Sequence, residues 1–538
     1  MAFQNINDAV KVFDEMPQRN VASLNAMISG FSQNGHYEEA LLVFREVGIR
    51  KFRPNSVTIA GALSACDAVE HGGQVHCWAI KLGVERDVYV GTGIVTMYMT
   101  CAELISAIKV FGTMGYRNVV SYNAFLSGLL QNEVNGVVLN VFKNMLQSSK
   151  ERPNSVTLIS VLGACSNISD LQFGRQIHGF VAKSGLNFDT LVGTALVDMY
   201  CKCGHCRWAY DIFRELNGKR NLITWNSMIA GMMSNGESDT AVELFSDIEA
   251  AGLVPDSATW NTIISGSSQL GKGMDALKFF KNMQSDGICP SLKALTSLLP
   301  ACSMLSSLQH GKEIHGHAIK ADIIYDEFLA TSLIDMYMKC GQFSWARRVF
   351  DQFDIKPVDP AFWNAMISGY GRNGDDKSAF EIFDMMREAN VQPNSATFMN
   401  VLSVCSHTGK LEKGWQVLRM MTSDYGLTST PEHFACVIDL LGRSGELDKA
   451  RDLALQIREP SASVFSSLLG ASGWHSNPSV GVDMAEKLVE FEPENSAPFV
   501  ILSNLYAAMG RWKDVQKIRD VMDLRKVKKL HGYSLNVT

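Results

Sequence analysis

The chain contains copies of its own sequence, and this repetition constrains the fold more than any other feature. A word close to NAMISG begins at five asparagines, which are separated by 98, 103, 35 and 103 residues. Two further words, close to ACSN and DMY, recur between these copies and share a step of 137 residues. Repeats of roughly 20–50 residues are typical of solenoids, propellers and arrays. The 538 residues therefore indicate one array of small units rather than three or four globular domains.

Within each unit the apolar residues have helical spacing. In residues 226–256, Ala241, Leu244 and Ile248 follow the pattern of an amphipathic helix. A glycine turn at 234–236 separates this helix from an earlier apolar one, and a glycine and a proline end the unit. One such hairpin cannot bury its apolar faces alone, but stacked hairpins can. We therefore predict an all-α fold, an α-solenoid superhelix of stacked helix–turn–helix hairpins, without β-structure.

The composition excludes several classes of protein. Apolar residues make up 46% of the chain, but no apolar run reaches the roughly 20 residues that a membrane-spanning helix requires. Lys and Arg total 49 against 55 Asp and Glu, a net charge of −6, which argues against nonspecific polyanion binding as the main function. The 12 cysteines lack the spacing of an extracellular disulfide framework and indicate a reducing compartment.

The repeat length and the repeated words resemble the pentatricopeptide repeat family. The alternation of P, L and S units is similar to its plant PLS subfamily, and the sequence from Pro431, PEHFACVIDLLGRSGELDKA, is specific to the last pair of such units. Two stretches, LSNLYAAMGRWKDVQKIRDVM from Leu502 and VKKLHGYSLNV from Val527, resemble the C-terminal extension motifs of the E subgroup. The resemblance covers essentially the whole chain.

The resemblance implies three regions: a partial S-type repeat at 1–20, an array of repeats at 21–461, and extension motifs (an E domain) at 462–538. Because the first region holds only half a unit and no Arg-rich transit peptide, we expect a chain that is truncated at its N-terminus. The units of the array are 21–55, 119–154, 222–256, 257–291 and 360–394 (P type), 56–87, 155–189, 292–326 and 395–430 (L type), and 88–118, 190–221, 327–359 and 431–461 (S type).

In this family single-stranded RNA lies along the first helices, with one base per repeat. The resemblance implies that two residues of each unit face that base. We call the residue four positions after the start of the unit the first recognition residue, and the last residue of the unit the second. An asparagine amide suits pyrimidine edges, and a threonine hydroxyl fits beside larger purines. The implied pairs are Asn25 with Asn55, Thr92 with Asn118, Asn123 with Asn154, Thr194 with Asn221, Asn226 with Asp256, Asn261 with Ser291, Thr296 with Asp326, Thr331 with Asp359, and Asn364 with Asn394.

The code of the family, carried over to these pairs, predicts the preferred bases. Thr with Asn implies adenine, Thr with Asp guanine, Asn with Asp uracil, and Asn with Asn or Ser a pyrimidine. The footprint from 5′ to 3′ becomes Y–?–A–Y–?–A–U–C–(G)–G–Y–?–?, where the L units at Ala60, Ile159 and Met399 give no base. A single asparagine is more simply a helix cap, but five at one phase favour recognition. Lys202 and Lys339 also share a phase, and lie either near the RNA backbone or in solvent at a helix end.

Two groups of cysteines resemble metal or catalytic sites, and we interpret neither as one. The cluster at 201–206 lacks paired ligand spacing, and the matching units keep only its second cysteine. Cys165 and His178 lie 13 residues apart, but their spacing recurs in another L unit and indicates packing. The zinc deaminase signature, HxE followed by PCxxC, is absent from the sequence. We therefore expect no enzyme activity, no cofactor, no metal site and no small-molecule substrate.

These features lead to a hypothesis about function. We expect a sequence-specific organelle RNA-binding protein that recognises sites of C-to-U editing, while the extension at 462–538 recruits a deaminase in trans. That partner would be a deaminase-bearing pentatricopeptide repeat protein or another editing factor, and the edited C would lie a few nucleotides 3′ of the base facing 431–461. The alternatives are an RNA stability, splicing or translation factor, and a protein-binding helical scaffold. The expected compartment is the mitochondrion, with the chloroplast as the alternative.

Overall fold

The structure is a computed structural model that describes residues 6–16, 18–49, 52–148, 151–186, 189–457, 460–474, 478–525 and 527. These residues form 31 α-helices and no β-strand, which confirms the predicted all-α solenoid. None of the helices in the described ranges is both long and apolar enough to cross a membrane. The chain divides into two compact units, Met1–Gly266 and Ser267–Thr538, which we describe separately.

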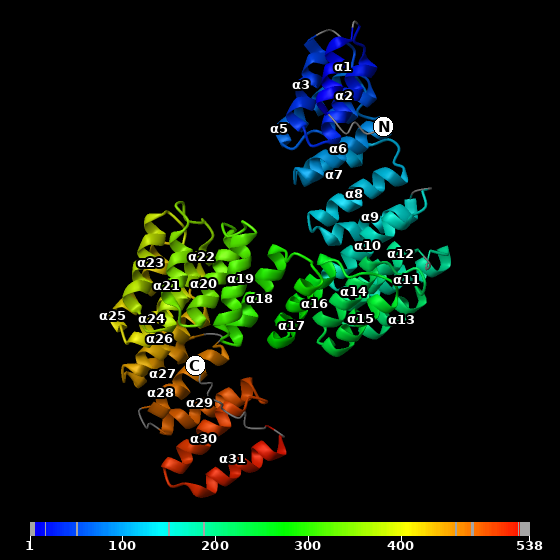
Figure 1. Cartoon of the computed structure of the whole chain (residues 1–538). Helices are drawn as coiled ribbons and strands as arrows, with labels where there is room; N and C mark the ends of the chain where they lie inside the picture. Colours follow the sequence, from blue (N-terminus) through cyan, green and yellow to red (C-terminus); the bar gives the residue numbers. More distant parts are fainter. Residues whose placement is uncertain are drawn as a thin grey trace. The chain divides into compact units, whose positions relative to one another are not determined.

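In the first compact unit, α1 (Ile6–Glu15) precedes a series of helical hairpins (Figure 1). Each first helix of a hairpin contacts the first helix of the next, so that these helices form one row. The first helices are α2 (Val21–Gln33), α4 (Ser56–Leu63), α6 (Val88–Thr100), α8 (Val119–Gln131), α10 (Ser155–Ile168), α12 (Thr190–Lys202) and α14 (Leu222–Ser234). The second helices are α3 (Tyr37–Ile49), α5 (Val69–Lys81), α7 (Leu104–Thr113), α9 (Asn135–Ser148), α11 (Leu171–Ser184), α13 (Cys206–Glu215) and α15 (Ser238–Ala250).

The second compact unit repeats this arrangement, and α16 (Ser257–Gln269) lies at the division between the two. Its first helices again contact one another in sequence from α18 to α30. They are α18 (Leu292–Met304), α20 (Glu327–Lys339), α22 (Pro360–Arg372), α24 (Ser395–Thr408), α26 (Pro431–Arg443), α28 (Ala462–Trp474) and α30 (Ser496–Ala508). The second helices are α17 (Gly273–Ser285), α19 (Leu308–Lys320), α21 (Phe343–Asp351), α23 (Asp376–Glu388), α25 (Leu411–Ser423), α27 (Leu447–Gln456), α29 (Pro478–Phe491) and α31 (Trp512–Leu524).

Local sequence sets the helix ends. The side chains of Asn55 and Asn154 accept hydrogen bonds from backbone N–H groups in the first turns of α4 and α10, and form capping boxes there. Between the two helices of a hairpin, Gly236 and Gly374 adopt φ of 83° and 78°, which a residue with a Cβ rarely tolerates. The chain therefore reverses at glycines in hairpins such as these and at other left-handed residues, such as Ala102 and Glu133, in others, and it restarts its first helices at polar caps.

The glycine that ends the NAMISG words allows the first helices to approach one another closely. A Cβ on Gly128 would overlap the side chain of Met99 from the preceding first helix, and one on Gly369 would overlap Met338 in the same way. The two methionines are 2% exposed, so the contact is part of the core. The repeated glycine is therefore required by helix packing, since interiors are close-packed and any added carbon must displace a neighbour.

The helices that carry the ACSN and DMY words contact each other in both copies, and in the first copy a serine–aspartate bond joins the words, whereas Ser303 of the second copy donates to the Leu299 carbonyl. Ser166 Oγ donates to Asp198 Oδ2 at 3.1 Å. His178, on α11, hydrogen-bonds through Nδ1 to the Tyr200 hydroxyl at 2.9 Å, and its ring meets the tyrosine ring edge-on. Equivalent pairs join His76 to Tyr98 at 3.0 Å and His315 to Tyr337 at 2.8 Å. The 137-residue step of both words thus reflects one conserved packing arrangement between an L unit and the following S unit.

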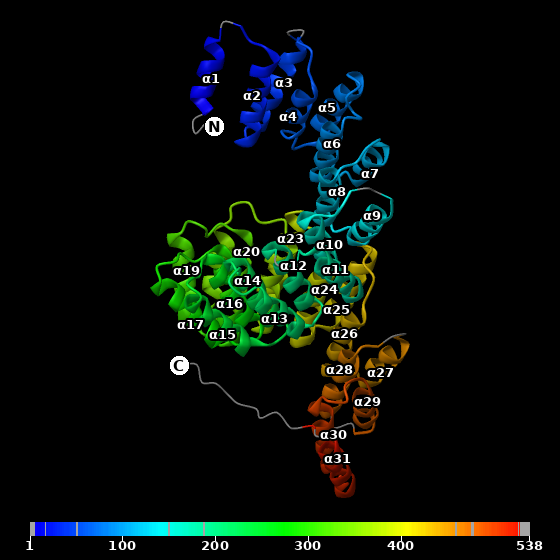
Figure 2. The same cartoon turned by 90° about the vertical axis from the view of Figure 1, so that its right-hand side faces the viewer.

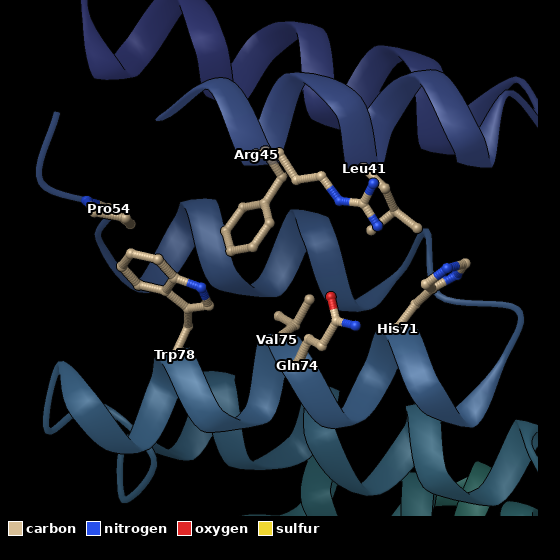
Figure 3. A pocket seen from close by; sticks show the side chains of 8 residues that line it. Leu41, Arg45, Pro54, His71, Gln74, Val75 and Trp78 are labelled. Carbon is tan, nitrogen blue, oxygen red and sulfur yellow. The ribbon is translucent and has the colours of Figure 1, made fainter. Parts of the chain in front are cut away.

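The first L unit is packed differently from the second. Its first helix α4 is shorter than α10, and His71 of α5 lies five residues before the tyrosine-bonded histidine, where α11 has the buried Phe173. A cavity of about 360 Å³ lies between α3 and α5. Figure 3 shows Val75 and Trp78 of α5 among the side chains that line it. An aromatic ring fills the equivalent place in the next L unit, since Phe173 packs there edge-on against Phe142.

Candidate nucleic-acid interface

The predicted recognition residues lie at the junctions between consecutive first helices. The first recognition residue of a pair stands in the first or second turn of a first helix, and the second caps the N-terminus of the next first helix. Because consecutive first helices contact each other, as for α4, α6, α8 and α10 in Figure 2, both members of a pair approach the same junction. The two side chains that could read a base therefore belong to one unit, and they meet where the next unit begins.

At three junctions two asparagines are hydrogen-bonded to each other. The Nδ2 group of the first residue donates to Oδ1 of the second, at 3.2 Å for Asn25 and Asn55, 3.0 Å for Asn123 and Asn154, and 3.5 Å for Asn364 and Asn394. Oδ1 of Asn154 also accepts from the backbone N–H of Thr157 at 3.1 Å. The carbonyl oxygen of the second asparagine is thus occupied by the protein, and its NH₂ group is the part that can donate to a base.

At the junction after 222–256 a carboxylate replaces the second amide. Asp256 Oδ1 accepts from the backbone N–H and the hydroxyl of Thr259, each at 2.8 Å. Although burial acts to raise it, the hydrogen bonds from Thr259 and from the Asn226 amide hold the pKa of Asp256 below its ordinary value. The side chain is therefore ionised at neutral pH and offers a base only acceptor oxygens.

The threonine residues predicted to face purines are bonded differently. Each hydroxyl donates to a carbonyl four residues earlier in its own helix. The distances are 2.6 Å for Thr92, 2.7 Å for Thr194, 3.0 Å for Thr296 and 2.8 Å for Thr331. Their partners in the pairs cap the following helix by accepting a backbone N–H, at 2.9 Å for Asn118, 3.0 Å for Asn221, 2.9 Å for Asp326 and 2.9 Å for Asp359.

One predicted pair is divided between the two compact units. Asn261 lies on α16, in the first unit, and Ser291 caps α18 in the second by accepting the backbone N–H of Ala294 at 3.3 Å. Both residues have further polar interactions. The local role of Ser291 is thus the same as that of the other second recognition residues.

The row of first helices is hollowed beside these residues. A groove of about 990 Å³ is lined by Ala60, Thr92 and Asn118, together with residues of α4, α6 and α8. Ala60 and Thr92 are the first recognition residues of consecutive units, so equivalent positions open onto one groove. A second groove of about 640 Å³, beside α24, α26 and α28, is lined by Asp439, Arg443 and neighbouring serines.

The two phased lysines are exposed at the ends of first helices, where each forms an ion pair. Lys202 Nζ lies 3.0 Å from Asp198 Oδ2, and Lys339 Nζ lies 2.7 Å from Asp335 Oδ2. Ion pairs of this exposed kind contribute little to stability. The lysines are therefore available to exchange an internal carboxylate for an external anion.

Sequence reasoning missed a threonine at most of these junctions. It lies three residues after the second recognition residue, and its side chain is buried while its hydroxyl bonds to that residue. The signal is visible as an N-x-x-T or D-x-x-T word at each of these unit boundaries, a form of capping box. The residues are Thr58, Thr157, Thr224, Thr259 and Thr397.

The cysteine–histidine spacing of the L units brings no reactive thiol together with a base. His178 is bonded to Tyr200, and burial raises the pKa of the Cys165 thiol to about 12. A nucleophilic cysteine requires the opposite shift. Cys201 packs against Gly231 of the next first helix, where a Cβ would overlap its sulfur. In the described part of the chain, no three metal-ligating side chains converge on one point.

The junction geometry defines a helical-hairpin array, and comparison with known sequences places it in a family. Sequence models of the PPR repeat family match residues 220–266, 255–304 and 358–407, and those of the PPR repeat match 22–50, 194–220, 328–354 and 396–425. A model of the E motif matches 475–535. The chain belongs to the pentatricopeptide repeat family, and the E motif agrees with the E subgroup that its sequence predicted.

Individual relatives agree with this assignment. A pentatricopeptide repeat-containing protein of Arabidopsis thaliana is 53% identical over 536 residues, which cover 100% of this chain and 87% of that protein. Two others from the same plant, named chloroplastic and mitochondrial, are 33% and 32% identical and cover 99% and 98% of this chain, and 61% and 72% of their own lengths. The crystal structure of the pentatricopeptide repeat protein PPR10 from maize shares the fold, with a TM-score of 0.52, 16% identity, and coverage of 97% of this chain and 87% of that one.

Proposed function

We propose that this protein binds single-stranded RNA in a sequence-specific manner, with one base at each junction, and that it recognises sites of C-to-U editing in an organelle. The observation that carries the proposal is the junction geometry: paired polar side chains recur at the same place along a row of contacting helices. Pentatricopeptide repeats read RNA with two or three side chains per base. A protein-binding scaffold has no need for such pairs at a constant phase.

The hydrogen bonds give a physical basis for the predicted bases. With its carbonyl occupied by Thr157 and Asn123, Asn154 presents N–H donors, which suit the N3 acceptor of cytosine or the O4 acceptor of uracil. Asp256 presents only acceptors, which suit the N3–H donor of uracil. Thr92 directs its hydroxyl proton into its own helix and so presents lone pairs to the amino group of adenine.

Affinity would come partly from the phosphates. The net charge of −6 does not favour binding along the whole surface, so local cations must meet the backbone. Lys202 and Lys339 lie eight residues after the first recognition residue of their units, on the same first helices, and their carboxylate partners are exposed. Exchange of these carboxylates for phosphates makes the affinity salt-sensitive.

The E motif supports the editing part of the proposal. It matches 475–535, in the region that we assign to recruitment of a deaminase in trans. The helices α28 to α31 continue the array there, and the stretch from Val527 lies almost entirely outside the described residues. The proposed compartment is the mitochondrion, with the chloroplast as the alternative, because relatives are named for both organelles.

Binding to synthetic RNA tests the recognition part. A 13-nucleotide RNA with the predicted footprint should bind more tightly than a scrambled RNA of the same composition, and equal affinities would remove the proposal. In the full chain, Asn226→Thr together with Asp256→Asn should shift the preferred base at the seventh nucleotide from uracil to adenine. The matched control is Asn364→Thr, which creates the same Thr–Asn pair because residue 394 is already Asn, and it should shift only the eleventh nucleotide toward adenine.

Transcript sequencing of a loss-of-function plant tests the editing part. The expected result is one or a few cytidines that are edited in the parent plant and unedited in the mutant, with the footprint a few nucleotides 5′ of each. Unchanged editing with altered transcript ends, splicing or abundance would support the stability, splicing or translation factor instead. Neither change would contradict both.

A further inference from the structure

A buried threonine recurs at five junctions, three residues after the second recognition residue. It stands in the first turn of the next first helix, and its side chain is fully excluded from solvent at every one of these positions: Thr58, Thr157, Thr224, Thr259 and Thr397 are each 0% exposed. A buried hydroxyl needs a hydrogen-bond partner, and a missing one is costly. The bonds of this group therefore determine how the junction is arranged.

At the junction after 119–154 the bonds form a closed ring of three side chains. Thr157 Oγ donates to Asn123 Oδ1 at 2.6 Å. Asn123 Nδ2 donates to Asn154 Oδ1 at 3.0 Å, which also accepts from the backbone N–H of Thr157 at 3.1 Å. The backbone N–H of Asn154 donates in return to Thr157 Oγ at 3.2 Å.

The same ring is present one period earlier in the chain. Thr58 Oγ donates to Asn25 Oδ1 at 2.7 Å, and Asn25 Nδ2 donates to Asn55 Oδ1 at 3.2 Å. The backbone N–H of Thr58 donates to the same Asn55 oxygen at 3.0 Å. Two independent junctions with the same residues thus have the same arrangement.

The ring fixes which end of the asparagine amide faces which way. A backbone N–H can only donate, so that of Thr157 requires an oxygen from Asn154. That oxygen in turn requires an N–H from Asn123, whose own oxygen is then directed to the threonine hydroxyl. If the Asn123 amide were turned over, its oxygen would meet the Asn154 oxygen, and the short bond from the Thr157 hydroxyl would be lost, which leaves that proton the 3.0 Å contact with Asn154 Oδ1.

The orientation of this amide matters for a base. Cytosine presents an acceptor at N3 beside an amino donor, whereas uracil presents a donor at N3 beside a carbonyl acceptor. An asparagine that offers N–H and C=O side by side matches cytosine in one orientation and uracil in the other. A fixed amide therefore discriminates between the two pyrimidines, and an amide that can turn over does not.

We propose that the buried threonine is a positioning residue for base recognition: Thr157 and Thr58 hold Asn123 and Asn25 in one amide orientation, and so determine the choice between cytosine and uracil at the nucleotide facing each unit. The threonine does not touch the base itself. The inference rests on the proposed RNA-binding function and adds a third residue, supplied by the following unit, to each recognition pair.

The chain also contains junctions at which this ring of hydrogen bonds is incomplete. At all three asparagine junctions the threonine Oγ lies 2.9–3.0 Å from Oδ1 of the second asparagine. After 360–394, however, Asn364 Oδ1 is buried with no partner in the described part of the chain, so the bond to the first asparagine is missing. At the junction after 327–359 the corresponding residue is Phe362, which has no hydroxyl. The ring is thus complete only where an asparagine accepts the threonine proton.

The test compares Thr157→Val, which removes the hydroxyl at nearly constant shape, with Thr157→Ser, which keeps it. The probes are 13-nucleotide RNAs with the predicted footprint, in which either the first or the fourth nucleotide is cytosine or uracil. We expect the parent protein to prefer one pyrimidine at the fourth nucleotide by on the order of fivefold. The preference should fall to about twofold or less in Thr157→Val, where Asn123 keeps its bond to Asn154 but loses the bond from the hydroxyl, and should persist in Thr157→Ser.

The first nucleotide provides the control within the same protein. Its preference should be unchanged in Thr157→Val, because Thr58 still holds Asn25, and the reciprocal variant Thr58→Val should lose only that preference. A variant that fails to fold would lose both preferences together with its affinity, and the reciprocal variant then decides the question.

The outcomes separate the two proposals. If the parent binds matched and scrambled RNA equally, the proposed function is wrong. If the parent binds the matched RNA but Thr157→Val and Thr58→Val keep their pyrimidine preferences, or if the parent shows none at either nucleotide, the threonine does not act as a positioning residue.

Discussion

The junction after 119–154 and the junction after 88–118 hold their recognition residues in different ways. Asn123 is held by two residues of other helices, through bonds of 3.0 Å to Asn154 and 2.6 Å from Thr157. Thr92 donates to the carbonyl of Val88 in its own helix at 2.6 Å. Asparagine recognition therefore depends on the next unit being docked, whereas the threonine is oriented by the helix that carries it.

The helices that carry the threonines are anchored elsewhere. Tyr98, Tyr200 and Tyr337 lie on the same first helices as Thr92, Thr194 and Thr331, and each is bonded to a histidine of the preceding L unit. The P units have no histidine at the corresponding place. The comparison shows two kinds of contact in one array. Contacts with the following unit (forward contacts) orient the asparagines, and contacts with the preceding unit (backward contacts) hold the helices that carry the threonines.

Removal of a second recognition residue should have the largest effect. Asn154→Ala removes the cap of α10 and the partner of Asn123, so we expect a loss of about 2 kcal/mol in local stability. Asn118→Ala removes the cap of α8, but Thr92 keeps its own bond, so the loss should be about 1 kcal/mol. Hydrogen exchange of the first-turn amides of α10 and α8 measures both values. Equal losses of stability in the two variants would mean that the hydrogen bond between Asn123 and Asn154 does not stabilise the junction.

Stability measured at a series of pH values tests the histidine–tyrosine contacts with the preceding unit, and the effect should be smaller than that of removing a cap. Burial lowers the pKa of His76, His178 and His315 below the ordinary value of 6.5. The unfolded chain therefore takes up protons first, so the contribution of these pairs is present above pH 6.5 and declines as the pH falls below it. His315→Gln keeps a bond to Tyr337 without titrating, and its melting temperature should fall less between pH 7.5 and 5.5 than that of the parent. Parallel curves would contradict this account.

Exchange of a charge at the end of a first helix should have the smallest effect on stability. Lys339→Gln should change the free energy of unfolding by less than about 0.5 kcal/mol, because its ion pair is exposed. In the RNA titration it should lower the slope of log affinity against log salt by about 0.7. The P unit at 119–154 has Gln131 at the same phase, so Gln131→Lys should raise the slope by a similar amount. No change in either variant would place these positions away from the phosphates.

The fold could be predicted from the sequence because apolar spacing recurs along the whole array and turn glycines recur in many of its units. The period also located the asparagines of the recognition pairs. The bonds between them could not be predicted, because a cap and a base-reading amide have the same sequence signal: Asn154 is both a helix cap and the partner of Asn123. Only the arrangement of neighbouring units distinguishes these roles.

Two further features left a signal that the sequence reasoning did not use. The histidine and tyrosine of each pair, such as His178 and Tyr200, are 22 residues apart in all three copies. The sequence analysis compared the histidine with the nearer Cys165, 13 residues away, and not with the tyrosine. Thr157 follows Asn154 by three residues, a spacing that predicts a capping box but does not reveal the third bond to Asn123. Long-range contacts of this kind depend on how hairpins stack, which spacing within one unit does not contain.

The close contact at the NAMISG glycine also affects how such a chain can change in length. Met99 meets Gly128 as Cys201 meets Gly231, at the same phase of consecutive periods. Loss of the 103 residues between the two contacts would bring Met99 against Gly231, an interface of the kind that the protein already has. Unequal crossing-over between repeated gene segments could therefore add or remove whole periods without requiring any new interface. Under the proposed function, each such event would lengthen or shorten the RNA sequence that the array reads.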